Sequence, residues 1–181
     1  MAVVSLVALL GTSDSIHVVS RIEELVEGFD LGKLSRAPAR FDEAELRQLS
    51  ARLLHHLDWA EVKHRLPEDN EAFWLAVRGN IETLADVALW RAVIAGPVSA
   101  AVEPADAEFV RQSVAHLPEE PWSGVTWKQW TDGLKAATGR KGKALFMPLR
   151  LALTGLDHGP ELAALLPLIG RDKARQRLLQ A

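Results

Sequence analysis

The chain has 181 residues, of which 48% are hydrophobic, and it contains no cysteine. A chain of this length and composition can bury a core as one domain or two small ones, while the lack of cysteine excludes disulfides, thiolate metal ligands and thiol catalysis and fits a reducing compartment. The formal net charge of −3 by itself argues against a nucleic-acid-binding protein.

The first residues form the longest apolar run of the chain, MAVVSLVALLG at 1–11. No basic residue precedes this run, and it is far shorter than the ~20 residues that a membrane-spanning helix needs. The run therefore predicts a core helix rather than a signal peptide or a membrane span.

Three residues with side-chain oxygens are each followed, three positions later, by a glutamate, which is the pattern of a helix-capping box. The pairs are Ser20 with Glu23, Asp42 with Glu45, and Asp58 with Glu61. Each pair predicts a helix start, and leucines at helical spacing follow the second pair.

Seven further helices are predicted from apolar periodicity and from Gly or Pro at their ends. They are expected at 70–79, 83–95, 104–117, 126–137, 142–154, 160–169 and 171–180. No segment alternates as a half-buried strand does, so the predicted fold is all-α. The polar segment LPEDNE suggests two small helical subdomains, at 1–68 and 69–181.

Enzymatic motifs are lacking. No glycine-rich phosphate loop follows a strand, and no serine sits in a nucleophile elbow. His55, His56 and His64 lie near Asp58 and Glu61, but their spacing favours exposed histidines at helix ends over a metal site. We therefore expect neither catalytic residues nor metal ligands in this chain.

Trp122, Trp127 and Trp130 cluster before the basic part of the chain. If exposed, they would stack on unpaired bases; if buried, they belong to a core. Burial is the favoured interpretation, because tryptophan is mostly buried.

Charge is distributed unevenly. Residues 1–127 hold 11 Lys or Arg against 20 Asp or Glu, whereas residues 128–181 hold 10 against 4. This asymmetry points to a polyanionic partner for the basic end, the alternative being a solvated face. The candidates for phosphate contacts are Arg140, Lys141 and Lys143, and the same surface is expected to extend to Arg171, Lys173, Arg175 and Arg177.

Arg150 is the only charged residue between Lys143 and Asp157, and it follows Pro148 by two positions. Pro148 lacks the amide hydrogen that would bond to the carbonyl of Ala144, so a kink or a new helix start is expected there. An arginine near a helix N-terminus suits phosphate or base-edge recognition. The alternative is an ion pair with an acidic residue of another helix.

The stretch GRKGKALFMPLRLALTGLDHGPELAALLPLIGRDKARQRL, at 139–178, resembles the C-terminal segment of bacterial glutamyl-tRNA synthetases. Upstream, LVALLGTSD and RFDEAELRQLSARLL resemble the helical region that follows the catalytic domain of that family. The ATP-binding motifs of those class I enzymes are lacking, so the chain resembles a fragment or a truncated relative.

The resemblance implies an anticodon-binding region built as an α-helix cage, which holds tRNA(Glu), or also tRNA(Gln), for glutamylation by the missing domain. ATP and Mg²⁺ are then needed only by the full-length enzyme, and this chain is expected to be a cytoplasmic monomer without a cofactor. Arg47 and Arg150 match anticodon-recognising arginines of similar sequences, and Gly159, Pro160 and Leu162 match a turn that contacts an anticodon base. The alternative function is a helical protein-interaction or regulatory domain derived from such a module.

Overall fold

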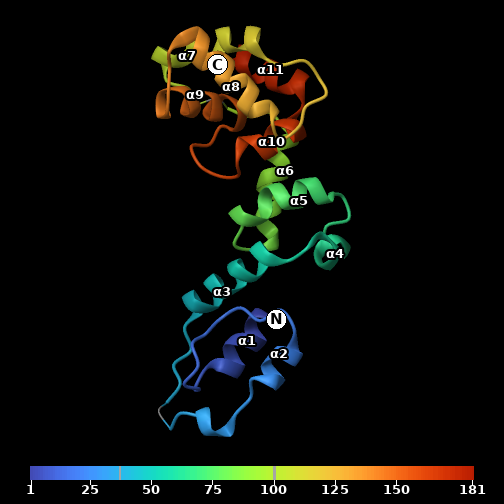
Figure 1. Cartoon of the computed structure of the whole chain (residues 1–181), viewed down its shortest axis with the longest axis vertical. Helices are drawn as coiled ribbons and strands as arrows, with labels where there is room; N and C mark the ends of the chain where they lie inside the picture. Colours follow the sequence, from blue (N-terminus) through green and yellow to red (C-terminus); the bar gives the residue numbers. More distant parts are fainter. Residues whose placement is uncertain (37, 100) are drawn as a thin grey trace. The chain divides into compact units, whose positions relative to one another are not determined.

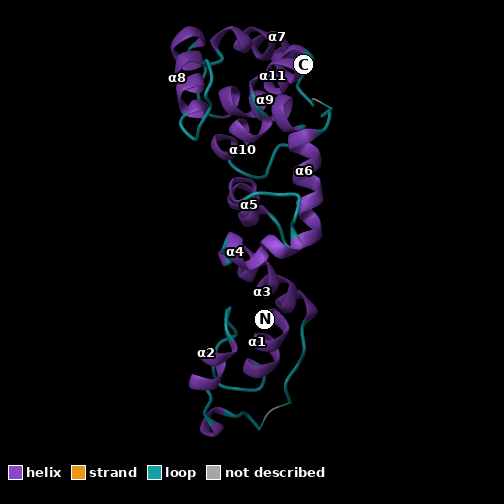
Figure 2. Cartoon of the chain, turned by 90° about the vertical axis from the view of Figure 1, so that its right-hand side faces the viewer, coloured by secondary structure: helices purple, strands orange, loops and turns teal. Residues whose placement is uncertain are grey.

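The computed structural model describes residues 1–36, 38–99 and 101–181. Within these ranges it contains eleven α-helices joined by loops and short 3-10 turns, and no strand (Figures 1 and 2). The all-α prediction is therefore confirmed. No helix in these ranges has both the length and the apolar character that crossing a membrane requires.

Contacts divide the chain into two units. The first comprises residues 1–71 with 78–87, and the second comprises residues 72–77 with 88–181. The chain thus passes between the units three times, so no single boundary in the sequence separates them. The functional boundary between residues 68 and 69 stays a prediction.

The first unit is built around the packing of its first helix against its third. Its helices are α1 (Ala2–Leu9), α2 (Ile22–Glu27), α3 (Glu43–His56) and α4 (Trp59–Val62). Leu6 of α1 and Leu49 of α3 are buried, and Leu49 belongs to the helically spaced leucines that the sequence predicted to face a core. The run at 1–11 is therefore a helix whose inner residues form part of a core.

Two of the three predicted caps are present in this unit. The Asp42 carboxylate accepts a hydrogen bond from the amide of Ala44 at 2.8 Å, and Asp58 forms a reciprocal capping box with Glu61. The prediction for Ser20 was wrong, because α2 begins after Arg21 and has no side-chain cap.

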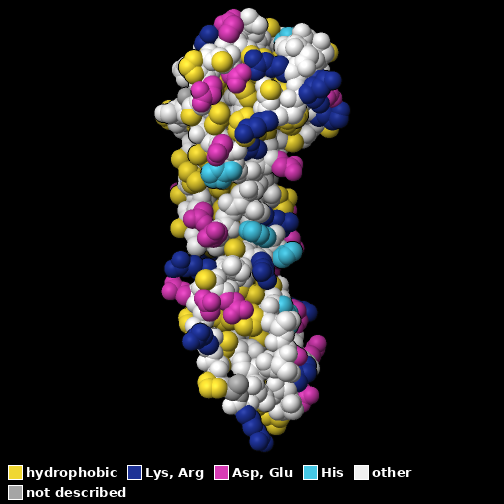
Figure 3. All heavy atoms as spheres, turned by 90° about the vertical axis from the view of Figure 1, so that its left-hand side faces the viewer, with side chains coloured by type: hydrophobic (Ala, Val, Ile, Leu, Met, Phe, Trp, Pro, Cys, Tyr) yellow, Lys and Arg dark blue, Asp and Glu magenta, His cyan; other side chains and the backbone are white. Residues whose placement is uncertain are grey.

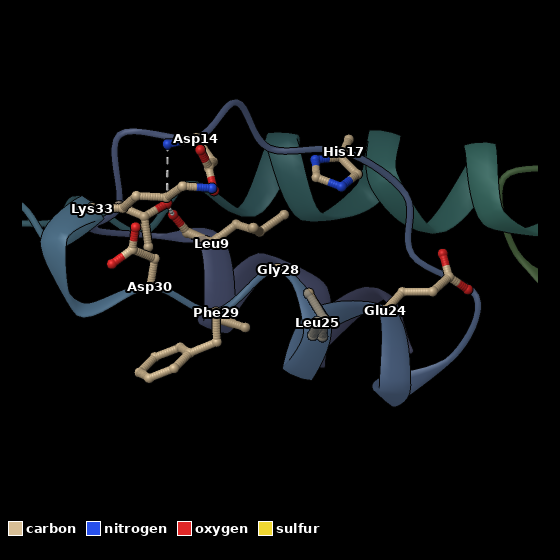
Figure 4. A pocket seen from close by; sticks show the side chains of 11 residues that line it. Leu9, Asp14, His17, Glu24, Leu25, Gly28, Phe29, Asp30 and Lys33 are labelled. Carbon is tan, nitrogen blue, oxygen red and sulfur yellow. Dashed lines mark hydrogen bonds and ion pairs between the residues drawn. The ribbon is translucent and has the colours of Figure 1, made fainter.

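A pocket of about 100 Å³ lies among α1, α2 and the 3-10 turn Leu31–Lys33. The Lys33 ammonium pairs with the Asp14 carboxylate at 3.0 Å, and the amide of Ser13 donates to the Lys33 carbonyl at 2.9 Å. Figure 4 shows the Lys33 and Asp14 side chains pointing toward one another, with the Phe29 ring turned away. These contacts fasten the loop after α1 to the turn.

The second unit holds most of α5 (Glu71–Val77) and of α6 (Val87–Ala95). It continues with α7 (Pro104–Ser113), α8 (Thr126–Thr138), α9 (Lys143–Thr154), α10 (Leu162–Ile169) and α11 (Arg171–Leu179). Leu145, Leu149 and Leu153 of α9 are fully buried at four-residue spacing. Because α9 contacts α7, α8 and α11, its buried stripe anchors the unit.

Helix α9 continues through Pro148, where the sequence predicted a kink or a new start. The carbonyl of Ala144, which Pro148 leaves without its helical donor, accepts a hydrogen bond from Arg140 Nη1 at 3.1 Å. Helix α10 also departs from its prediction, since it begins at Leu162 and leaves Pro160 in the loop.

Candidate nucleic-acid interface

Arg150 directly follows the buried Leu149 on α9, is itself half-buried, and reaches the loop before α10. Its Nη2 donates to the carbonyl of Pro160 at 2.9 Å, while its Nη1 is shielded from solvent and has no acceptor among the described residues. Burial lowers the pKa of the Arg150 guanidinium, and the charge of Asp157 raises it. An arginine nevertheless stays charged. The predicted alternative of an ion pair is not found in the described part of the chain.

An open pocket of about 260 Å³ lies beside this guanidinium. Its lining comprises Trp127, Phe146, Arg150, Glu161, Leu162 and Ala163. The ring centroids of Trp127 and Phe146 are 6.1 Å apart. The pocket therefore combines a guanidinium with two aromatic side chains, a combination that suits a flat, polar-edged group such as an unpaired base.

The tryptophan cluster is divided between core and pocket. Trp130 is 1% exposed and donates its indole N–H to the carbonyl of Ser113 at 3.0 Å, so the core interpretation is correct for it. Trp127 is half-buried and meets Trp130 edge-on, with centroids 5.6 Å apart. Sequence reasoning missed Phe146, because its position in an apolar helical run gave no signal of a partly exposed ring.

The turn before α10 brings the other predicted residues to the same place. Gly159 has a φ of +120°, and a Cβ there would lie 2.1 Å from the Trp90 ring. Pro160 is buried and accepts the bond from Arg150, and Leu162 lines the pocket. Arg150 and these three residues therefore lie together, and their part in RNA recognition stays a prediction.

The basic loop between α8 and α9, together with the first residue of α9, contains cations of two kinds. Lys141 is exposed and has no partner among the described residues, and Lys143 is exposed with only the longer-range charge of Asp157 acting on it. Arg140 instead pairs with Asp106. Lys141 and Lys143 thus remain suitable for phosphate contacts.

The predicted extension of the basic surface along α11 is wrong at Arg177. This side chain is 4% exposed and donates to the carbonyls of Leu153, Val93 and Gly96 at 2.6 to 2.8 Å. Lys173 also donates to a backbone carbonyl, and Arg171 pairs with Glu119 at 2.8 Å. On the face drawn in Figure 3, the cations of the second unit lie among acidic side chains rather than in an unbroken patch.

Arg47 lies in the first unit, on α3. Its side chain is 70% exposed and pairs with Glu43, four residues earlier, at 2.8 Å. An exposed pair of this kind contributes little to stability. Arg47 is therefore free to exchange its partner for another anion, and its role in recognition stays a prediction.

The described residues contain no group of three His, Cys, Asp or Glu side chains that could hold a metal ion. His55, one of the histidines weighed as a ligand, instead contacts the carbonyl of Ile81 through Nε2 at 2.9 Å.

Residues 48–181 match a family model described as an anticodon binding domain. A glutamate–tRNA ligase 2 of Beijerinckia indica subsp. indica is 52% identical over 184 residues, and a glutamate–tRNA ligase 1 of Maricaulis maris is 50% identical over 182 residues. Each alignment covers 98% of this chain but 40% of the relative, so the chain spans two fifths of the length of these relatives.

Among solved structures, a glutamate tRNA ligase from Elizabethkingia meningosepticum matches with a TM-score of 0.77 at 21% sequence identity. The match covers 99% of this chain and 40% of that chain. At this identity the match establishes a shared fold.

Proposed function

Because the chain belongs to the anticodon-binding domains of glutamate–tRNA ligases, we propose that it binds the anticodon loop of tRNA(Glu) through the site on α9. The observation that carries this proposal is the Arg150 guanidinium. It is anchored at Nη2, lacks an acceptor at Nη1, and lies beside an open pocket that contains Trp127 and Phe146.

A buried donor without an acceptor costs about 1–3 kcal/mol, and more when it is charged. A small movement of Arg150 into the neighbouring pocket would let a ligand acceptor remove this cost. Bases of an anticodon loop are unpaired, so their faces can stack on aromatic rings and their edges can reach a guanidinium fork. The pocket offers both kinds of contact.

The proposed roles of the remaining residues follow from their exposure. Lys141 and Lys143 would contact phosphates beside the loop, and the turn at Gly159 and Pro160 would present backbone groups to a base. Arg47 would contribute from the first unit, as its resemblance to a recognition arginine implies. Whether tRNA(Gln) is also bound would depend on these contacts.

The activity of the whole protein is a further part of the proposal. The relatives are glutamate–tRNA ligases, so we propose ATP-dependent glutamylation of tRNA(Glu) in the cytoplasm, carried out by a part of such a ligase that this chain does not match. ATP and Mg²⁺ would be bound in that part.

Arg150→Ala is expected to weaken the binding of tRNA(Glu) by about 1–3 kcal/mol, roughly 5- to 150-fold, because a base edge loses its donor. A filter-binding titration at fixed salt measures this change. Arg175→Ala is the matched control, because it removes one exposed positive charge from the same unit and should change the affinity much less. Equal losses in the two variants, with both folded, would argue against base recognition by Arg150.

Lys141→Ala is expected to lower the slope of log K against log salt by about 0.7, the contribution of one phosphate contact to a single strand. Its affinity for tRNA(Glu) and for an unrelated tRNA should fall by similar factors, because a phosphate contact carries no sequence information. Titrations at several salt concentrations measure the slope. An unchanged slope would remove Lys141 from the interface.

The alternative function, a protein-interaction or regulatory domain, makes a different prediction in the same assay. Wild-type chain is titrated with tRNA(Glu) and with the same tRNA carrying a replaced anticodon. Tighter binding of the natural anticodon supports the proposed function, even if the affinity is low. Equal or undetectable binding of both favours the alternative.

A further inference from the structure

Arg140 makes three contacts that together leave its guanidinium little freedom. Its Nη1 forms an ion pair with the Asp106 carboxylate of α7 and also donates to the carbonyl of Ala144 in the first turn of α9. The guanidinium lies over the Phe109 ring, 4.2 Å from the ring centroid. Arg140 thus links α7 to the start of α9, whereas the neighbouring Lys141 has no partner in the described ranges.

The contact with Ala144 has a specific cause. Pro148 cannot donate to that carbonyl, which lies in the exposed first turn of α9 and therefore takes its hydrogen bond from a side chain or from water. Arg140 supplies it from outside the helix. Without this bond, the first turn of α9 would be held less firmly on α7.

The first turn of α9 leads directly to the proposed RNA site. Phe146 follows Ala144 by two residues, and Arg150 follows Phe146 by one turn. Both line the pocket beside Trp127. A shift in the start of α9 would therefore move the Phe146 ring relative to Trp127 and to the Arg150 guanidinium.

We propose that Arg140 is a positioning residue, which acts with Asp106 to hold the start of α9 so that the Phe146–Arg150 pocket keeps its shape. It is not a phosphate contact, the role that the sequence suggested. This inference rests on the proposed RNA-binding function, and it assigns Asp106, an acidic residue, a favourable effect on the binding of a polyanion.

The sign of the Asp106→Asn effect separates the two roles. If Arg140 contacted phosphate, Asp106→Asn would free the guanidinium and remove a repulsive charge, so the chain would bind tRNA(Glu) more tightly. If Arg140 positions α9, Asp106→Asn loosens it and weakens binding. We expect a loss of about three- to tenfold, the range that one hydrogen-bonded pair supports, with an unchanged salt slope.

Three further variants and one control complete the measurement. Arg140→Lys keeps the charge but not the planar fork, so it should bind about as weakly as Asp106→Asn. Arg140→Gln is measured alone and together with Asp106→Asn, and the two losses should not add, because both substitutions break the same Arg140–Asp106 ion pair. Lys141→Gln is the control, because it should lower the salt slope.

All affinities are measured well below the melting temperature of each variant, with folding checked by circular dichroism. Unchanged or tighter binding of tRNA(Glu) by Asp106→Asn would overturn the inference. If the variant has a lower stability but a normal affinity, the ion pair is a purely structural contact, and the inference is overturned as well. Additive losses in the double variant would also overturn it. If the wild-type chain does not bind tRNA(Glu), the proposed RNA-binding function is wrong. That result is distinguishable from the outcomes above, because in each of them the wild-type chain binds.

Discussion

Arg177→Ala is expected to lower the free energy of unfolding of the second unit by about 3–5 kcal/mol, because each buried carbonyl left without a donor costs about 1–3 kcal/mol. The Arg177 guanidinium donates to the carbonyl of Leu153 at 2.6 Å, near the end of α9. It also donates to carbonyls of Val93, Ile94 and Gly96, at the end of α6. One side chain thus caps two helices.

Three of the four carbonyls lose the donor seen here in the alanine variant, whereas that of Ile94 keeps the Lys173 ammonium at 3.1 Å. Burial lowers the pKa of the Arg177 guanidinium, and no carboxylate pairs with this group within the described residues. Hydrogen bonds to carbonyl oxygens therefore supply the interactions that offset the desolvation of the Arg177 guanidinium. This dependence makes the site sensitive to substitution, since a smaller side chain leaves both a cavity and unsatisfied acceptors.

Urea denaturation followed by tryptophan fluorescence measures this effect. Five of the six tryptophans lie in the second unit, so the signal reports mainly on that unit. Arg175→Ala is the control, because Arg175 is exposed on the same helix and its loss should change stability by about 0.5 kcal/mol or less. A similarly small change for Arg177→Ala would show that water replaces the lost bonds.

Gly159→Ala is expected to destabilise the second unit by about 2–4 kcal/mol, since it combines a strained backbone with overpacking. The φ of Gly159 is +120°, a conformation that residues with a Cβ rarely adopt. The added methyl group would lie 2.1 Å from an atom of the Trp90 ring. Because Trp90 is 3% exposed, its ring has little room to move aside.

The same denaturation experiment measures Gly159→Ala against a control of opposite sign. Gly133 lies inside α8, and a Cβ there would meet no atom within 4 Å. Gly133→Ala should therefore stabilise the chain by about 0.5–1 kcal/mol. Wild-type stability in Gly159→Ala would mean that the turn has another accessible conformation, and the proposed presentation of the Pro160 carbonyl to Arg150 would need revision.

Local signals in the sequence were sufficient to locate most helices. The predicted segments at 126–137, 142–154 and 171–180 differ from α8, α9 and α11 by one residue at most at either end. Glycine ends α8 and α9 in the left-handed conformation, as their composition indicated. These features depend on the backbone within one or two turns, so neighbouring residues determine them.

Errors arose where side-chain contacts, which the backbone pattern does not show, decided the outcome. Pro148 was expected to kink α9 or to begin a new helix; α9 instead continues through it, while the kink stays a prediction, and Arg140 donates to the carbonyl that the proline leaves free. The sequence shows the missing donor but not its substitute. Phe146 was missed for a related reason, since the exposure of one ring in an apolar helix depends on the helices packed around it.

For the site, the sequence by itself determined the all-α fold, the excess of cations in the last third of the chain, and the resemblance that singled out Arg150 and the turn at Gly159. Only the tertiary structure decided which cations are available to a partner. Arg177 and Arg140 are occupied by carbonyls and a carboxylate, whereas Lys141 is exposed. The physical reason is that a charge is a property of one residue, while its desolvation and its partners depend on segments up to 84 residues away.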